Sequence, residues 1–168
     1  AFADTWYIDD GDISISAGTN GNNVTQGSTT KENDTDTVIT NRESTASSNT
    51  VTIDAGEGET VNVTLENVNI DTSKTGEAAV SVTGSGNTNI ELNGNNTLTS
   101  GSGYAGLEHN KTDDSGTLTI QDEKNDDGSA KGSASDTTGS LTANGGYHGA
   151  GIGGSSEKNG QVTITGGE

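Results

Sequence analysis

Cysteine, proline and methionine are absent from the 168 residues, and aromatic side chains make up only 3% of the chain. Without cysteine there are neither disulfides nor thiolate metal ligands, so packing and backbone hydrogen bonds must hold the fold. Without proline, every residue can join a hydrogen-bonded ladder. These absences favour a protein built of strands and Gly/Asn turns.

Positive charge is scarce too, with 7 basic against 25 acidic residues and a formal net charge of -18. Such a chain repels phosphate backbones and anionic lipid surfaces, and its apolar runs are too short to span a bilayer. We therefore expect no nucleic acid partner and no membrane insertion. Divalent cations and neutral or cation-bridged polymers stay open as partners.

Strong core formers are few: Leu, Ile, Val and Phe together number 26. By composition alone such a chain would be disordered, so order must be argued from pattern. Apolar residues alternate with polar ones in several short segments, which predicts strands with one buried face. No segment shows helical spacing. The predicted strands include 61–65, 68–70, 80–82 and 90–92.

Two segments repeat later in the chain. "TLTSGSGYAG" (97–106) matches "SLTANGGYHG" (140–149) at a shift of 43, and "SGTLTI" (115–120) matches "NGQVTI" (159–164) at a shift of 44. Apolar strands also recur about 20 residues apart, as Ile70 and Ile90 do. Stacked units explain a constant period, whereas a β-sandwich has no reason to repeat. We predict an all-β parallel β-helix with coils of about 20–23 residues.

The chain reads as one domain. Residues 1–3 have the A-x-A form of a signal-peptide remnant, and 4–168 form a single β-helix domain, as part of a longer chain or fibre. Two polar segments predict long decorating loops. They are 20–48, where only "TVIT" reads as a strand, and 121–139.

A glycine spacing typical of dinucleotide loops, G-x-G-x-x-G, occurs at Gly149, Gly151 and Gly154 and again at Gly101, Gly103 and Gly106. That loop needs a helix after the glycines, and here a turn and a strand follow. We therefore expect no nucleotide cofactor and interpret the glycines as tight corners.

Aromatic residues are candidates for glycan contacts, because a ring face with a polar tip suits a sugar. Tyr104 and Tyr147 would stack two coils apart, either as an internal ladder or as a surface platform. Trp6 and Tyr7 would either cover the open end of the β-helix or bind ligand. With the neighbouring His148, these five residues are the candidate ligand-binding set.

Short acidic runs beside glycine supply the oxygen ligands that calcium prefers, although none has the spacing of an EF-hand or a nonapeptide repeat. A solvated acidic face is the alternative. The candidate metal ligands are Asp9, Asp10, Asp12, Asp113, Asp114, Asp126 and Asp127.

Catalytic patterns are lacking. His109 and His148 have no serine or carboxylate at a recognisable nucleophile or base spacing, and Arg42 is the only arginine. We expect a protein that is not an enzyme, with a polysaccharide lyase or hydrolase as an alternative.

The runs "WYIDDGDISISAG", "VNVTLENVNI" and "GYHGAGIGG…GQVTITGG" resemble the right-handed β-helix modules of secreted or surface proteins from anaerobic, often gut-dwelling, Gram-positive bacteria. The resemblance implies a right-handed β-helix that is secreted or on the cell surface and binds plant-type polysaccharide with calcium. The leading expectation is thus a non-catalytic adhesion or polysaccharide-binding module. A structural stalk or fibre whose subunits stack end to end is the competing hypothesis.

Overall fold

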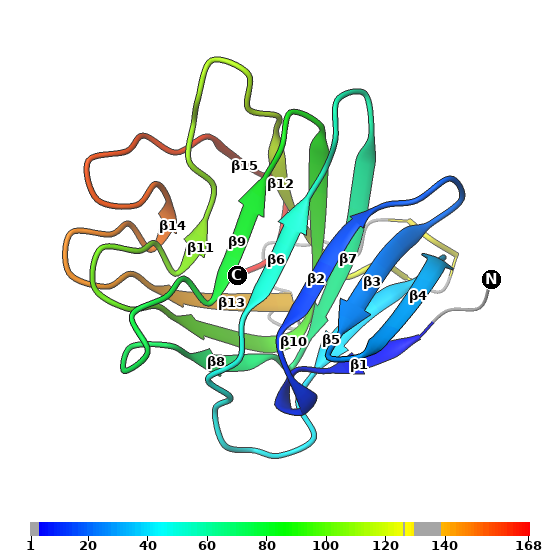
Figure 1. Cartoon of the computed structure of the whole chain (residues 1–168), viewed down its shortest axis with the longest axis horizontal. Helices are drawn as coiled ribbons and strands as arrows, with labels where there is room; N and C mark the ends of the chain where they lie inside the picture. Colours follow the sequence, from blue (N-terminus) through cyan, green and yellow to red (C-terminus); the bar gives the residue numbers. More distant parts are fainter. Residues whose placement is uncertain (1–3, 126, 130–138) are drawn as a thin grey trace.

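The computed structural model describes residues 4–125, 127–129 and 139–168, which form strands, turns and one short helix (Figure 1). The all-β prediction is confirmed. The predicted signal remnant at 1–3 lies outside the described residues. In chain order the elements are β1 (Thr5–Tyr7), the 3-10 helix η1 (Ile8–Asp10), β2 (Ile13–Ala17), β3 (Asn22–Gln26), β4 (Thr29–Asp34), β5 (Thr37–Thr40), β6 (Val51–Asp54), β7 (Thr60–Glu66), β8 (Asn69–Asp71), β9 (Val80–Thr83), β10 (Asn87–Thr99), β11 (Leu107–Glu108), β12 (Leu118–Asp122), β13 (Gly139–Asn144), β14 (Ile152–Gly153) and β15 (Val162–Ile164).

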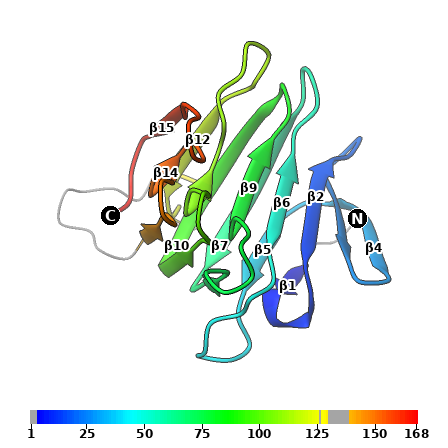
Figure 2. The same ribbon diagram turned by 60° about the vertical axis from the view of Figure 1, so that its left-hand side comes forward.

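Most strands pair in parallel with a later strand of the same sheet. We call the stretch of chain between two such partners a circuit. Within the first sheet, ordered β1-β5-β7-β10-β12-β15, Val63 pairs with Thr37 on one side and Ile90 on the other, and Ile90 pairs with Ile120. These partners are 26, 27 and 30 residues apart. Figure 2 shows the strands side by side in chain order along the molecule.

The long strand β10 contributes to two faces. Its first half pairs with β7 and β12, whereas its second half, from Gly94, pairs with β8 and β13 to form a second sheet. Gly94 stands between the halves with a φ of 65°, which favours glycine and lets the strand turn the corner. A third sheet, β14-β11-β9-β6-β2-β3-β4, forms the remaining face.

The core consists of columns of inward side chains, one from each circuit. Ile13, Val51, Val80 and Leu107 are register partners in the third sheet and are at most 1% exposed. Polar residues also stand in these columns, among them Thr88 and Asn96, each 1% exposed. The Asn96 side chain accepts from the backbone N–H of Val68 and donates to two carbonyls, so it ties neighbouring circuits together.

The predicted coil length of 20–23 residues is wrong. Ile70 and Ile90, which suggested it, lie in different sheets: Ile70 pairs with Leu98, and Ile90 with Val63. Alternation identifies inward positions but not the face to which they belong. The segments matched at a shift of 44 are direct neighbours, because Leu118 pairs with Val162, whereas coils of 20–23 residues would have placed another coil between them. The shift of 43 is wrong, because Leu98 pairs with Ala143, 45 residues further along the chain.

The predicted loop at 20–48 is also only partly correct. "TVIT" is strand β5, as expected, but β3 and β4 form an antiparallel hairpin that pairs with the outer edge of β2. The hairpin strands are rich in Thr and Asn and have few apolar residues, because one side of this sheet edge is solvated. They therefore lack the alternation that marks the other strands.

The second predicted loop, 121–139, is shorter than expected. Strand β12 continues to Asp122, and β13 begins at Gly139. Residues 126 and 130–138 of this segment lie outside the described residues.

Replacing Ile90 by alanine should lower the free energy of unfolding by about 2–5 kcal/mol, because its fully buried side chain contacts circuits on both sides. Urea unfolding followed by circular dichroism measures the change. Thr52→Ala, at an exposed position of β6, is the control and should stay within about 0.5 kcal/mol. An equal effect of both substitutions would contradict the column arrangement.

Candidate functional site

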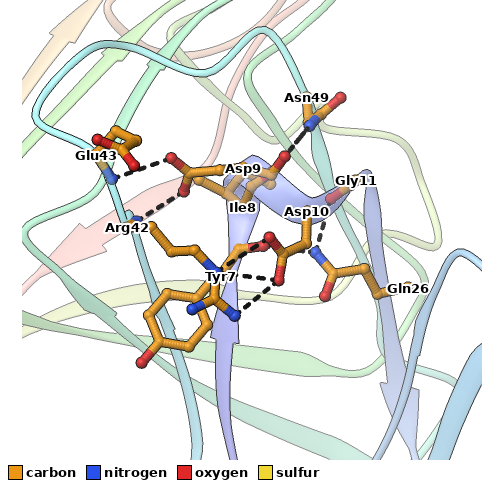
Figure 3. A network of polar contacts seen from close by, with 9 residues as sticks. All are labelled: Tyr7, Ile8, Asp9, Asp10, Gly11, Gln26, Arg42, Glu43 and Asn49. Atoms are coloured by element: carbon orange, nitrogen blue, oxygen red, sulfur yellow. Dashed lines mark hydrogen bonds and ion pairs between the residues drawn. The ribbon is translucent and has the colours of Figure 1, made fainter.

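The acidic cluster at Asp9, Asp10 and Asp12 joins the first circuit to the second, and Figure 3 shows the contacts of Asp9 and Asp10. Asp9 accepts hydrogen bonds from the backbone N–H groups of Arg42 (2.8 Å) and Glu43 (3.2 Å). Asp10 forms an ion pair with the Arg42 guanidinium at 3.0 Å, and Asp12 accepts from the backbone N–H of Thr50 at 2.8 Å. All three carboxylates are thus used as acceptors within the protein.

These hydrogen bonds affect the ionisation of Asp9. Partial burial alone would raise its pKa, but the N–H groups of Arg42 and Glu43 outweigh burial and hold the pKa below the ordinary 3.8. The charged form therefore stabilises the fold.

The neighbouring aromatic residues are covered rather than open. Trp6 is 6% exposed, and its indole N–H donates to the buried carboxylate of Asp34 at 2.9 Å. The Arg42 guanidinium lies 3.8 Å from the centre of the Tyr7 ring, as Figure 3 shows. Both side chains thus help to close the N-terminal end, and this placement lends no support to their predicted ligand role.

The other predicted metal ligands lie on loops far along the chain. Asp113 and Asp114 are exposed, and Asp127 accepts hydrogen bonds from Ser129, which lower its pKa. Asp126 lies outside the described residues. Among residues 4–125, 127–129 and 139–168, no three His, Asp or Glu side chains gather closely enough to hold a metal ion. Calcium binding stays a prediction.

Tyr104 and Tyr147 lie in adjacent turns at the corner between the second and third sheets. The backbone N–H of Gly103 donates to the carbonyl of Tyr147 (2.8 Å), and that of Gly146 donates to the carbonyl of Tyr104 (2.9 Å). The two turns therefore touch along their backbones. A side chain at Gly149 would collide with the Tyr104 carbonyl, which explains the glycine there.

The predicted stacking of these tyrosines two coils apart is wrong. One circuit separates them, and the register places Leu107 opposite Ile152, so Tyr104 lies opposite Gly149 rather than Tyr147. Both rings face solvent: Tyr104 is 38% and Tyr147 76% exposed. Tyr147 instead contacts the ring of His148, edge to face, with centroids 3.9 Å apart. We call Tyr104, Tyr147 and His148 the aromatic corner.

A polar groove that the sequence analysis did not identify crosses the outer face of the first sheet. It has a volume of about 470 Å³ and is lined by side chains from β7, β10, β12 and the flanking loops. Asn89 donates to Asn62 at 3.0 Å, and Thr64, Glu91 and Gln121 form a row in register. We call it the sheet-1 groove.

Glu91 is the half-buried carboxylate of the sheet-1 groove. Burial raises its pKa above the ordinary 4.5 and the nearby carboxylate of Asp36 adds to this, whereas Lys124 opposes it. The only available sequence signal was the outward amides Asn62 and Asn89, 27 residues apart, which look like any solvated strand positions until the register is known.

A second hollow of about 340 Å³ lies between β9, β11 and the loop at 110–116. Glu108 lines it and is 7% exposed; burial raises its pKa, and a hydrogen bond from the N–H of Ala105 partly opposes this. His109, 1% exposed, has its two ring nitrogens 3.1 and 2.8 Å from the carbonyls of Val82 and Gly116. His109 thus anchors the loop that carries Asp114 to the rim.

Comparison with known proteins finds no matching family model, no matching curated protein and no matching solved structure. The described part of the chain contains no helix with the length and apolar character needed to cross a membrane. Function must therefore be argued from the chain's own surfaces.

Asp9→Asn should lower stability by about 1 kcal/mol at pH 6, because charge-assisted hydrogen bonds on a partly exposed carboxylate are lost. Since the folded pKa lies below 3.8, this contribution is present above 3.8 and is lost as pH falls through the lower value. Urea unfolding should show a larger difference at pH 6 than at pH 3.

Asp113→Asn, at an exposed loop position, is the matched control and should change little at either pH. An equal loss from Asp9→Asn at both pH values would contradict the ionic role of Asp9. The same variant tests the calcium prediction, because a site at this cluster requires that calcium raise the melting temperature of the unaltered protein and not that of Asp9→Asn.

Proposed function

We propose that the parallel sheets form a right-handed parallel β-helix in which each coil contributes one strand to each of three faces. Support comes from the constant order of the strands in the first and third sheets and from β10, which turns from one face to the next. The right hand follows from the strong preference of parallel crossover connections for that hand.

We further propose a non-catalytic module on the cell surface or secreted from the cell, which binds a polysaccharide or a host-surface glycan. The exposure of the aromatic corner carries this proposal. Of the three large hydrophobic residues that are exposed in the described chain, two are Tyr104 and Tyr147. Exposed rings on an otherwise polar surface mark a contact site, and a phenol offers both an apolar face and a hydroxyl.

The fixed backbone of the two turns favours a ligand-binding role for the aromatic corner. Backbone hydrogen bonds between the turns fix the two tyrosines relative to each other. His148 has a φ of 67°, which is unfavourable for a residue with a side chain and holds its ring against Tyr147. A preorganised surface loses little conformational entropy when it binds.

Calcium assistance belongs to the same proposal, with the exposed Asp113 and Asp114 as the predicted ligands. A polysaccharide lyase or hydrolase stays the alternative in a different class. Release of reducing ends or unsaturated products from pectin-like polymers distinguishes it from a binding module.

Replacing both Tyr104 and Tyr147 by alanine should weaken polysaccharide binding by about tenfold or more, because each aromatic contact contributes on the order of 1 kcal/mol. A glycan array and a pull-down on insoluble polysaccharides, with and without calcium, measure retention. Thr52→Ala is the control on another face. Unchanged retention of the double variant, with a native circular dichroism spectrum, would remove the aromatic corner from the proposal.

A second candidate function is self-association, which the exposure of one inward apolar residue favours. Ile164 belongs to the inward column of Ile90 and Ile120, yet it is 61% exposed and borders an apolar hollow of about 80 Å³. At the other end the hairpin β3–β4 covers the edge of β2. Copies would meet in pairs through the surface that contains Ile164, and a fibre whose subunits stack end to end stays the competing arrangement.

Ile164→Asp should shift such pairs to monomers, because a charge would enter the apolar contact. Sedimentation velocity over a hundredfold concentration range measures the mass. Thr163→Asp, which adds the same charge at the neighbouring position, is the matched control. A protein that stays monomeric at every concentration would exclude this second function.

A further inference from the structure

We propose that the sheet-1 groove is a second binding site, separate from the aromatic corner, for an uncharged, hydroxyl-rich polysaccharide that crosses the strands. The inference shares with the proposed function only the expectation that the ligand is a glycan. Its position, its ligand chemistry and the direction of the chain follow from the groove alone.

The lining of the groove matches the hydrogen-bonding pattern of sugars. Asn62, Asn89, Gln121 and Asn125 each offer an amide donor and an acceptor, and Thr64 adds a hydroxyl at the floor, where it is 9% exposed. Sugar hydroxyls likewise donate and accept. Asn89 donates to Asn62, which orients both amides before any ligand arrives.

The register gives the groove its direction. Thr64, Glu91 and Gln121 are register partners on three neighbouring strands, so the row runs across the strands with about 4.8 Å between its members. This spacing is comparable to the length of a sugar ring in an extended chain. A polymer lying along the row would meet equivalent positions ring after ring, which a small ligand could not.

Charge favours an uncharged chain over a uronate polymer. The groove contains the carboxylates of Asp36 and Glu91 against the single cation of Lys124, and the whole protein carries -18. An anionic chain would be repelled. The Glu91 carboxylate accepts one hydrogen bond from the Asn93 amide and lines the groove, so hydroxyl donors of a neutral sugar would add hydrogen bonds to it.

Affinity gel electrophoresis and calorimetry with a mixed-linkage β-glucan, a galactomannan and polygalacturonate test the inference. The protein should bind at least one of the two neutral polymers, and polygalacturonate at least about tenfold more weakly, with or without calcium. The double variant Asn89→Ala with Gln121→Ala should lose about tenfold in affinity for the neutral polymer, since each lost hydrogen bond costs on the order of 1 kcal/mol. Thr52→Ala should bind like the unaltered protein.

The variants separate this inference from the proposed function. Weakened binding by the groove variant but not by the tyrosine double variant supports the groove and removes the aromatic corner. The reverse result overturns the inference and leaves the proposed function standing. Tighter binding of polygalacturonate than of both neutral polymers also overturns it. Retention of no polymer overturns both, provided that thermal melts show every variant folded.

Discussion

Parallel hydrogen bonding between successive circuits is the constraint on which the rest of the structure depends. Each circuit covers the backbone and the apolar side chains of its neighbour, so the environment of a residue is set by partners 26 to 30 positions away where no loop intervenes. The core is a set of narrow columns, and a chain with 25% hydrophobic residues can fill them. The turns between the sheets must also pack closely on the turns of the neighbouring circuits. A side chain on Gly116 would collide with the carbonyl of Gly86, and one on Gly86 with that of Gly56.

Stacking of this kind leaves strand edges at the ends, and the N-terminal end is closed by polar contacts. The hairpin β3–β4 covers β2, and the buried Asp34 accepts from Trp6 and Thr37. The carboxylates of Asp9 and Asp12 accept backbone N–H groups from the following circuit. Residue types that suggested calcium in the sequence thus satisfy backbone donors of the following circuit that lie outside its strands.

The sequence predicted strands and their parallel pairing, and it matched Leu118 to Val162, because inward apolar positions recur in similar contexts. The coil length attached to that match was wrong. The sequence-based predictions failed where they depended on which residues lie side by side in the folded chain. Alternation could not show that Ile70 and Ile90 face different sheets. The hairpin strands carry too few apolar residues to be recognised. The sheet-1 groove needs Asn62 beside Asn89, and nothing in their surroundings marks them before the register is known.

The register that aligns the core also aligns the outer side chains, so each face carries rows of outward side chains that cross the strands. The outer row of the third sheet runs through Ser14, Thr52 and Ser81, which are short hydroxyl side chains. The equivalent row of the first sheet carries an amide and a carboxylate, and the loops with Asp36 and Lys124 add walls to it. Loops add depth to such rows: the loops with Asp36 and Lys124 wall the sheet-1 groove, and the loop at 110–116 walls the hollow that Ser81 lines on the third sheet. A row that crosses neighbouring strands offers one contact per strand, and the partner that can use several such contacts at once is a polymer.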